Sequence, residues 1–270
     1  MYEFIERIGK GCFGVVWKAQ STRTKKFVAI KTAPVGVGSQ IRNEATYYKK
    51  LNQCGEKSRC NFIAQMLQFS IYDDQYVLIM PLYGRSMEAI IKRRKTNKIS
   101  PLSPHEINVI GSQMTTALHY IHSRGLVHRD IKPGNICRYE KNLSTKTVEH
   151  VVLCDMGFMT RRNKRPGTKT RGLTGTPLYA SVNGVSGYAQ TYQDDVESLY
   201  YTIIHMATGK LPWSSCKTRE TMDSKKIKSP PEHIARGFPT MFIQGLVHIR
   251  GLELYERPDY NFILNSFTSK

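Results

Sequence analysis

The sequence has no long apolar run, and this excludes the simplest membrane architecture. No stretch approaches the roughly 18 consecutive apolar residues that a membrane-spanning helix requires. The first residues also differ from a secretory signal, because Glu3 and Glu6 stand where basic residues and then a long apolar run would be expected. We therefore expect no membrane association and a location in the cytosol, the nucleus or both.

Closely paired cysteines are missing as well. The chain has 6 cysteines among its 270 residues, and none of them form a Cys-x-x-Cys pair. A chain of this length can bury an adequate apolar core without disulfides, so we expect reduced thiols. His119 and His122 have a spacing that two zinc ligands could use, but no Cys or His cluster supplies the remaining ligands. A structural zinc site is therefore not expected.

Acidic residues are few relative to basic ones. The chain has 40 Lys and Arg against 21 Asp and Glu, which gives a formal net charge of +19 at pH 7. Such a surface attracts acidic peptides, nucleic acids and other polyanions. The densest basic stretch, here called the basic run, contains Arg161, Arg162, Lys164, Arg165, Lys169 and Arg171. No aromatic residues are interleaved with it, so nucleic acid is expected only as a secondary partner.

No repeat, low-complexity tract or Pro- or Gly-rich linker divides the chain, and its two parts differ in periodicity. Short β-branched or aromatic runs predict strands in the first part, at residues 2–8, 15–19, 27–32, 64–71 and 76–82. A helix is predicted between them at residues 40–51. The sequence thus begins with a small β-rich part.

Helical patterns dominate the second part. Ser103-Pro104-His105-Glu106 has the form of a capping box, and an apolar stripe with helical spacing follows it. A second helical run covers residues 194–207 and ends near Gly209, and a short strand is expected at residues 151–154. The whole pattern predicts an α+β fold that changes from mainly β to mainly helical near residues 82–85.

A glycine-rich stretch near the N-terminus has the composition of a phosphate cradle. It reads Gly9-Lys10-Gly11-Cys12-Phe13-Gly14-Val15-Val16. Glycines let backbone amides approach phosphate oxygens without a side chain in the way. The pattern is weak alone, because dinucleotide-binding folds and ordinary turns share it. Here it lies between two expected strands, which favours a cradle over the phosphates of ATP.

Further charged residues complete the requirements of phosphoryl transfer. Lys31 ends an expected strand and would bind the α- and β-phosphates, while Glu44 on the following helix would hold its ammonium group. Read alone, both would be ordinary exposed residues. Asp155 follows an expected buried strand, where a carboxylate is costly unless it binds a partner such as Mg²⁺.

The most specific stretch is His128-Arg129-Asp130-Ile131-Lys132-Pro133-Gly134-Asn135. Asp130 would accept the proton of the attacking hydroxyl, and Lys132 would neutralise charge on the transferring phosphate. Asn135 would hold a magnesium ion. Chance assembly of these polar residues at this spacing is very rare, so the sequence predicts ATP- and Mg²⁺-dependent phosphoryl transfer.

Through these motifs the chain resembles the eukaryotic protein kinase family over nearly its whole length. Finer features are similar to the casein kinase 1 group, with some similarity to its tau-tubulin kinase branch. The matching stretches are Tyr179-Ala180-Ser181-Val182-Asn183, Asp194-Asp195-Val196-Glu197-Ser198-Leu199, Leu211-Pro212-Trp213 and Arg257-Pro258-Asp259-Tyr260. The resemblance implies a bilobal protein kinase fold, with a β-rich N-lobe of about residues 1–82 and a helical C-lobe of about 85–270. It also implies a monomer that phosphorylates serine and threonine in acidic proteins.

The resemblance assigns roles to individual residues. The expected catalytic residues are Lys31, Asp130, Lys132, Asn135 and Thr176, and the expected magnesium ligands are Asn135 and Asp155. The expected ATP site comprises Ile8, Gly9, Lys10, Gly11, Cys12, Phe13, Gly14, Val15, Val16, Ala29, Lys31, Glu44, Met80, Leu82 and Cys137. Asp195 would brace the catalytic loop from its helix.

Some positions depart from the family pattern. Leu178 stands where the casein kinase 1 group carries an Arg that helps to bind acidic or phosphorylated substrate residues. The basic run is expected to compensate, although it could instead be a mobile basic surface or a nuclear-import signal. Arg257 usually pairs with the glutamate of an Ala-Pro-Glu motif, which this chain lacks, so its partner is open. Met156 replaces the usual Phe but is also large and apolar.

Two alternatives to an active kinase find less support in the sequence. A catalytically inactive scaffold with the same fold would require a lesion at Lys31, Asp130, Asn135 or Asp155, and none is present. A basic nucleic-acid-binding module has no recognition signature in its favour. We further expect activity without phosphorylation of the loop that follows Asp155, although Arg129 could pair with a phosphate on Thr168, Thr170 or Thr174.

Overall fold

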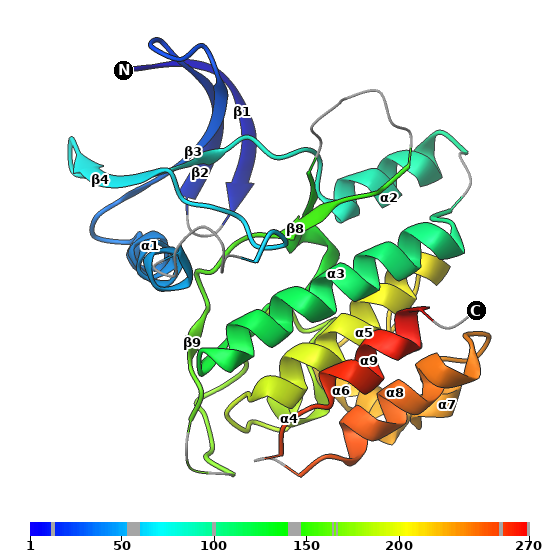
Figure 1. Cartoon of the computed structure of the whole chain (residues 1–270). Helices are drawn as coiled ribbons and strands as arrows, with labels where there is room; N and C mark the ends of the chain where they lie inside the picture. The colour runs from blue at the N-terminus through cyan, green and yellow to red at the C-terminus, as the bar shows by residue number, and fades with distance from the viewer. Residues whose placement is uncertain are drawn as a thin grey trace.

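The computed structural model describes residues 1–11, 14–52, 60–98, 101–139, 147–163, 165, 167–253 and 256–268. Within these ranges a β-sheet region is followed by a helical region, as the sequence predicts (Figure 1). Cys12, Phe13 and Lys164, which the sequence analysis assigns to the cradle and to the basic run, lie outside the described residues.

The β-sheet region contains five antiparallel strands in the order β1-β2-β3-β5-β4. They are β1 (Tyr2–Gly11), β2 (Gly14–Ser21), β3 (Phe27–Pro34), β4 (Gln68–Tyr72) and β5 (Gln75–Pro81). Helix α1 (Ser39–Asn52) packs on β3 and β5. Successive side chains of β3 point to opposite faces of the sheet, and both faces are apolar. Val28 and Ile30 join a small apolar cluster on one face, while Ala33 joins the main core on the other.

One predicted strand is wrong in its first half. The apolar run at residues 64–71 predicts a strand throughout, whereas β4 begins only at Gln68. At the start of the stretch the chain pairs with the helical region instead, because Ala64 N donates to the Leu153 carbonyl at 2.9 Å. Gln65 N donates to the Tyr83 hydroxyl at 2.8 Å. The apolar side chains there thus serve the contact between the two regions.

The helical region is built around a long central helix, α3 (Pro104–Ser123). Its other helices are α2 (Met87–Thr96), α4 (Val182–Val185), α5 (Tyr192–Thr208), α6 (Arg219–Lys228), α7 (Pro231–Ile234), α8 (Thr240–Gly251) and α9 (Tyr260–Thr268), with a 3-10 turn η2 (Pro133–Asn135). Its short strands are β6 (Leu126–Val127), β7 (Ile136–Arg138), β8 (Val151–Leu153) and β9 (Thr160–Arg161), paired as β6 with β9 and β7 with β8.

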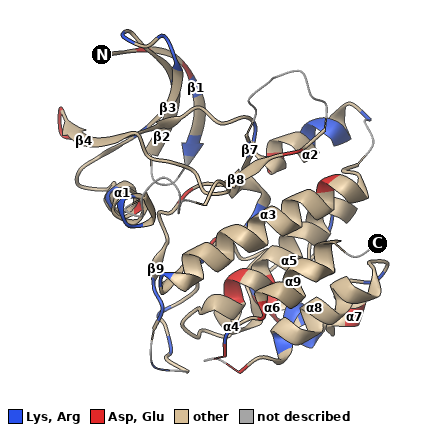
Figure 2. Cartoon of the chain, in the orientation of Figure 1, with Lys and Arg blue, Asp and Glu red and all other residues tan. Residues whose placement is uncertain are grey.

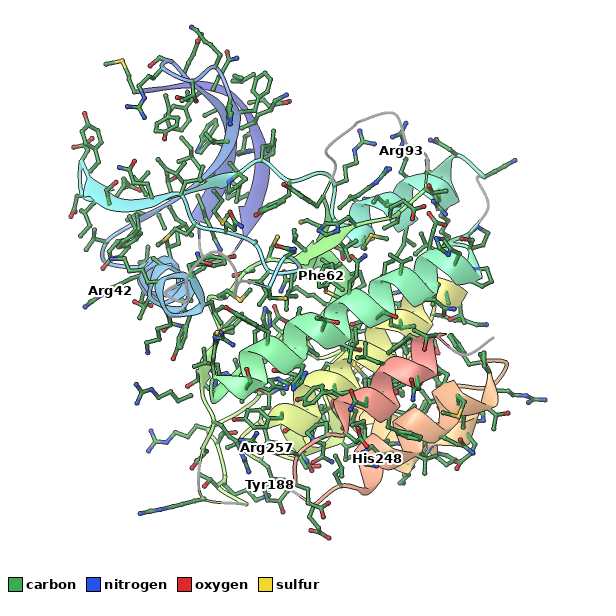
Figure 3. The ribbon with its side chains drawn as sticks, in the orientation of Figure 1. Arg42, Phe62, Arg93, Tyr188, His248 and Arg257 are labelled. Atoms are coloured by element: carbon green, nitrogen blue, oxygen red, sulfur yellow. The ribbon has the colours of Figure 1, made fainter. Side chains whose placement is uncertain are left out.

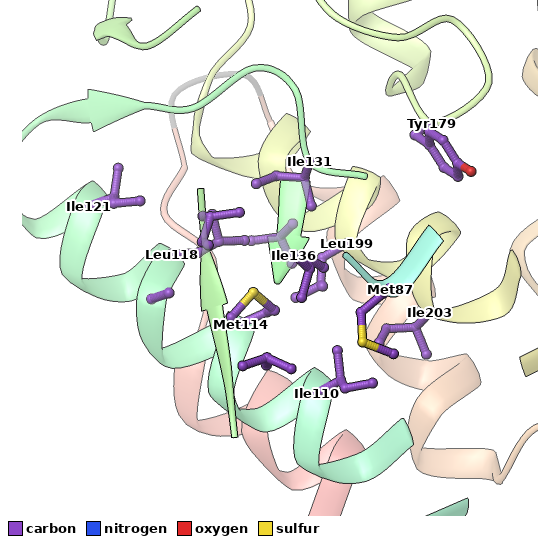
Figure 4. Close-up of a cluster of buried hydrophobic side chains, with 14 of the residues drawn as sticks. Met87, Ile110, Met114, Leu118, Ile121, Ile131, Ile136, Tyr179, Leu199 and Ile203 are labelled. Atoms are coloured by element: carbon purple, nitrogen blue, oxygen red, sulfur yellow. The ribbon is translucent and has the colours of Figure 1, made fainter. Parts of the chain in front are cut away.

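The predicted features of the two longest helices are confirmed. Ser103 and Glu106 form the reciprocal capping box of α3, and Gly209 ends α5 with φ of +75°, a conformation that favours glycine. The apolar stripe of α3 contributes Ile110 and Met114 to the main core, where they lie near Leu199 of α5 (Figure 4). This core includes Leu126 of β6, Ile136 of β7 and, between them, Ile131, and it thereby fixes the loop between β6 and η2 that carries Asp130 and Lys132.

No helix among the described residues is long and apolar enough to cross a membrane. The four cysteines that the structure describes are free thiols, namely Cys60, Cys137, Cys154 and Cys216.

Candidate active site

The predicted pair of Lys31 and Glu44 is present and buried. Lys31 on β3 donates to the Glu44 carboxylate on α1 at 2.7 Å, and it lies 3.4 Å from the Asp155 carboxylate that follows β8. Lys31 and Glu44 are 9% and 1% exposed, so neither is an ordinary surface residue. Burial alone would lower the pKa of Lys31, but the two carboxylates raise it above its usual value. Lys31 is thus a fixed cation between the sheet, α1 and the helical region.

Asp155 is held in a special backbone conformation. Its φ is +62°, and Gly157 N donates to its carboxylate at 3.3 Å. Burial would raise the pKa of Asp155, but Lys31, the Gly157 N–H and His128 together lower it below its usual value, so the carboxylate is ionised at neutral pH. Met156 is fully buried in the main core, which agrees with the packing role expected of it.

Helix α1 also holds the chain beyond Asp155. Asn43 donates from its side-chain amide to the Gly157 carbonyl at 2.7 Å and to the Met159 carbonyl at 3.2 Å. Sequence reasoning missed this contact, because an Asn within a polar helix gives no signal of a partner more than a hundred residues away. One helix therefore positions both the partner of Lys31 and the segment that starts with Asp155.

The glycine-rich stretch lies in the hairpin of β1 and β2, as predicted. Gly9 pairs with Val16 and Gly11 with Gly14. Gly14 has a φ of +136°, and a Cβ there would lie 2.2 Å from the Thr32 carbonyl oxygen, so only glycine fits. This close approach brings the hairpin against β3 beside Lys31. A phosphate cradle at this position could act on the same phosphates as Lys31.

The remaining predicted ATP-site residues lie along the sheet and the connection to α2. Val16 pairs with Lys31, and Ala29 with the buried Met80. Cys137 on β7 forms a bridge with Ser86, which places the connection that contains Leu82 beside β7. Ile8 and Lys10 are exposed on β1, and Val15 is half-buried on β2. The structure thus places Val16, Ala29 and Met80 of the predicted ATP site on the neighbouring strands β2, β3 and β5.

The predicted catalytic residues of the second region are in mutual contact. Lys132 Nζ lies 2.7 Å from the Asp130 carboxylate and donates to Thr176 Oγ1 at 2.9 Å. Thr176 donates in turn to Asp130 at 2.7 Å. Asn135 donates to the Asp130 backbone carbonyl at 2.8 Å and to its carboxylate at 3.2 Å. Asp130 is 4% exposed, so its carboxylate is oriented by these contacts rather than by bulk water.

Asp195 braces this loop from α5, as expected. Its carboxylate accepts from His128 N at 2.6 Å and from Arg129 N at 2.7 Å. His122 Nε2 lies 2.9 Å from the same carboxylate, and its other ring nitrogen bonds to the Tyr260 hydroxyl. Burial would raise the pKa of Asp195, but His122 and the backbone donors keep it below the usual value. Arg129 has a φ of +71°, so the brace holds a conformation that few non-glycine residues adopt.

A magnesium ion would find suitable ligands here. The side-chain amide nitrogen of Asn135 is occupied by Asp130, which leaves its carbonyl oxygen as a ligand. Cys154 N donates to the Asn135 backbone carbonyl at 2.8 Å, so the end of η2 that carries Asn135 lies beside the end of β8 that precedes Asp155. An amide oxygen and a carboxylate, completed by phosphate oxygens and water, suit the hard Mg²⁺ ion. The residues therefore fit the group that the sequence predicts.

The structure gives Arg257, which is labelled in Figure 3, an aromatic neighbour. Its guanidinium lies 5.8 Å from the ring centre of Tyr192, at the start of α5. A neighbouring ion pair joins Arg250 of α8 to Glu197 of α5 at 3.4 Å, and Glu197 also accepts from Val182 N at 3.2 Å. A carboxylate from α5 thus holds the chain near residue 182.

A basic cavity of about 310 Å³ lies beside the catalytic loop. Its lining includes Arg129, Arg161, Thr170 and Thr174. Arg129 Nε donates to the Phe158 carbonyl at 2.7 Å, which turns the guanidinium toward the chain that follows Asp155. The cavity has the charge and size to receive an anionic group.

Comparison with known proteins agrees with this geometry. The family model of the protein kinase domain matches residues 2–244. The chain is also similar to a probable serine/threonine-protein kinase of Dictyostelium discoideum, with 27% identity over 265 residues. The alignment covers 96% of this chain but 51% of the relative, so the chain spans about half the length of that protein.

Proposed function

The chain belongs to the protein kinase family, and from this premise we propose that it transfers the γ-phosphate of ATP to serine or threonine hydroxyls of proteins. The main support for this proposal is the mutual contact among Asp130, Lys132 and Thr176. The buried pair of Lys31 and Glu44 supplies the second part of the site. Phosphoryl transfer depends mainly on positioning and on charge stabilisation, and this arrangement supplies both.

Each residue has a definite task in this proposal. Asp130 accepts a hydrogen bond from the substrate hydroxyl and then its proton, while Lys132 stabilises charge on the transferring phosphate. Lys31 holds the α- and β-phosphates, with its position set by Glu44. Asn135 and Asp155 would hold Mg²⁺, which would supply positive charge to offset that of the phosphates. Thr176 orients Asp130 and Lys132 toward each other.

The test is transfer of radiolabelled phosphate from ATP to casein, followed by identification of the phosphorylated amino acid. We expect phosphoserine and phosphothreonine with the wild type. Asp130→Asn, Lys31→Met and Asp155→Asn should each lower turnover by about a hundredfold or more. Asp74→Asn, in an exposed turn, is the matched control and should be unaffected. A near-normal rate for Asp130→Asn, or no transfer by the wild type, would contradict the proposal.

We also propose a casein kinase 1-like preference for acidic substrates. Leu178 is half-buried and packs against the main core, so the substrate's acidic groups must meet other cations. On the segment after Asp155, the exposed cations are Arg161, Arg165, Lys169 and Arg171, and part of this segment lines the basic cavity. Figure 2 shows basic residues along this segment below β9. Their charge supports encounter with acidic peptides, and secondarily with other polyanions.

Further proposals concern the oligomeric state, the location, the lobe boundary and the activation of the protein. We propose that the protein acts as a monomer in the cytosol, the nucleus or both, with its lobes divided near residues 82–85. Activity without loop phosphorylation is supported by Thr176, which already contacts Asp130 in the unphosphorylated chain.

A further inference from the structure

Lys226 is a fully buried lysine on an otherwise polar helix. It lies on α6 with 0% of its surface exposed, whereas its neighbours Lys225 and Lys228 are exposed. Lysine is almost never fully buried unless its ammonium group is paired. The residues around the Lys226 ammonium group therefore show which part of the chain it binds.

The ammonium group binds the segment that follows Thr176. Lys226 Nζ donates to the Pro177 carbonyl at 2.7 Å and to the Ala180 carbonyl at 2.6 Å. Between them, the Leu178 carbonyl accepts from Trp213 Nε1 at 2.8 Å. Three backbone carbonyls within residues 177–180 are thus fixed by two buried side chains.

Aromatic rings enclose the ammonium group on its remaining sides. Lys226 Nζ lies 5.1 Å from the ring centre of Trp213 and 5.7 Å from that of Tyr201. Both rings are 0% exposed, so the cation–π contacts are desolvated and correspondingly strong. An ammonium with two carbonyl acceptors and two ring faces is held in one place.

The segment held in this way leads directly away from the reacting groups. Thr176 contacts both Asp130 and Lys132, so residues 177–180 leave the place where the substrate hydroxyl must lie. Residues 177–180 are therefore the backbone next to the place where a peptide would present its hydroxyl to Asp130. We infer that Lys226 is a positioning residue for the peptide substrate, which fixes residues 177–180 through the carbonyls of Pro177 and Ala180. This inference rests on the proposed kinase function.

The energetics favour a functional reason for a lysine at this place. Burial of a charged group is costly, and an apolar side chain of similar volume is often neutral or stabilising in its place. Burial lowers the pKa of Lys226 to about 7; Glu197 and Asp223 act against this, and Arg219 and Arg250 add to it. The site therefore retains a costly cation whose contacts all lie at the substrate-facing segment or its supporting rings.

The first test separates positioning from general stability. Lys226→Met keeps most of the side-chain volume but removes both donors, and Lys225→Met is the matched exposed control. We expect the peptide KM of Lys226→Met to rise about tenfold, with kcat and the KM for ATP within about twofold of wild type. A purely structural role would lower the active fraction, and hence apparent kcat, with both KM values unchanged. That pattern would overturn the inference.

The second test does not require turnover. Hydrogen exchange of the full chain should show faster exchange of amides 178–182 in Lys226→Met than in Lys225→Met, with α3 and α5 unchanged. Equal exchange in the two variants would refute the inference even if the wild type transferred no phosphate, an outcome that would refute the proposed function separately. If Lys226→Met does not fold, Trp213→Phe removes the donor to Leu178, and its peptide KM should rise about threefold. An unchanged KM there would count against the inference.

Discussion

At the scale of single residues, Thr176 connects two groups that phosphoryl transfer uses at different moments. Its hydroxyl donates to Asp130, which must accept a proton, and it accepts from Lys132, which must face the phosphate. A hydroxyl can serve both neighbours because it is a donor and an acceptor at once. Asp130 and Lys132 also form a direct ion pair at 2.7 Å, and Thr176 is hydrogen-bonded to both members of this pair.

We predict that Thr176→Val lowers kcat about tenfold to hundredfold, because it removes one oriented hydrogen bond to each catalytic group. Thr176→Ser keeps the hydroxyl and should retain kcat within about threefold. Steady-state kinetics with saturating ATP and peptide measure both variants. Equal losses for Val and Ser would show that the methyl group, and not the hydroxyl, matters.

A second residue-scale prediction concerns Lys226 and pH. Its pKa is lowered in the folded chain to about 7 from an unfolded value near 10.5. The unfolded chain therefore binds more protons at this site between these two values, so stability from this group rises as pH increases from about 7. Below about pH 7 both states are protonated, and the cost of the buried ammonium is constant.

We expect the free energy of unfolding of wild type, relative to Lys226→Met, to increase between pH 7 and pH 9. Urea unfolding at several pH values provides the measurement, and subtraction of the Met variant removes the titration of all other groups. A difference that stays constant over this range would mean that Lys226 titrates normally.

At the scale of elements, α5 organises the site through acidic residues on its first turns. Asp194 accepts from Ser181 at 2.6 Å, Asp195 holds the catalytic loop, and Glu197 binds Val182 N and Arg250. All three carboxylates are buried at 1% exposure or less. One helix thus fixes both the loop that carries Asp130 and the segment that ends near residue 182.

Asp195→Asn should therefore reduce stability and turnover together. An amide cannot accept from both backbone N–H groups and from His122, so at least one buried donor is left unpaired, at about 2 kcal/mol or more. Urea unfolding and kinetics measure the two effects. Glu6→Gln breaks an exposed pair with Lys18 and should cost about 1 kcal/mol or less. A variant as stable and active as wild type would refute the bracing role of Asp195.

The contrast between predicted and missed features also belongs to the scale of elements. Chemistry restricts residue types at Lys31, Asp130 and Asp155, and hydrophobic period restricts α3 and α5, so the sequence predicts them well. Lys226 has no such signal, since in sequence it looks like the exposed Lys225 beside it. The strand at residues 64–71 fails for a related reason. An apolar run does not reveal whether its backbone pairs with a strand or with a distant loop.

At the scale of the whole molecule, the net charge of +19 is spread over several surfaces. Two groups of exposed cations carry the same charge but lie on different parts of the structure. Arg161, Arg165 and Arg171 lie on the segment after Asp155, whereas Lys92, Arg93 and Lys95 lie on α2 (Figures 2 and 3). Arg162 belongs to neither group, because it is half-buried over the ring of Tyr192 at 4.9 Å.

These two groups allow a test of substrate preference at constant total charge. We predict that neutralising Arg161, Arg165 and Arg171 to Gln raises the KM for an acidic peptide several-fold more than for a neutral one, with little change in kcat. Exposed pairs contribute about 1 kcal/mol or less each and act on encounter and binding rather than on the chemical step. The salt dependence of the acidic peptide's KM should fall as well, because screening acts on the removed charges.

Neutralising Lys92, Arg93 and Lys95 in the same way is the matched control, since it removes an equal charge from α2. If position matters, this control shifts the KM ratio between acidic and neutral peptides much less than the first variant does. Equal shifts in both variants would mean that the preference arises from net charge alone, through long-range attraction. An unchanged ratio in both would refute the proposal that these exposed cations create a preference for acidic substrates.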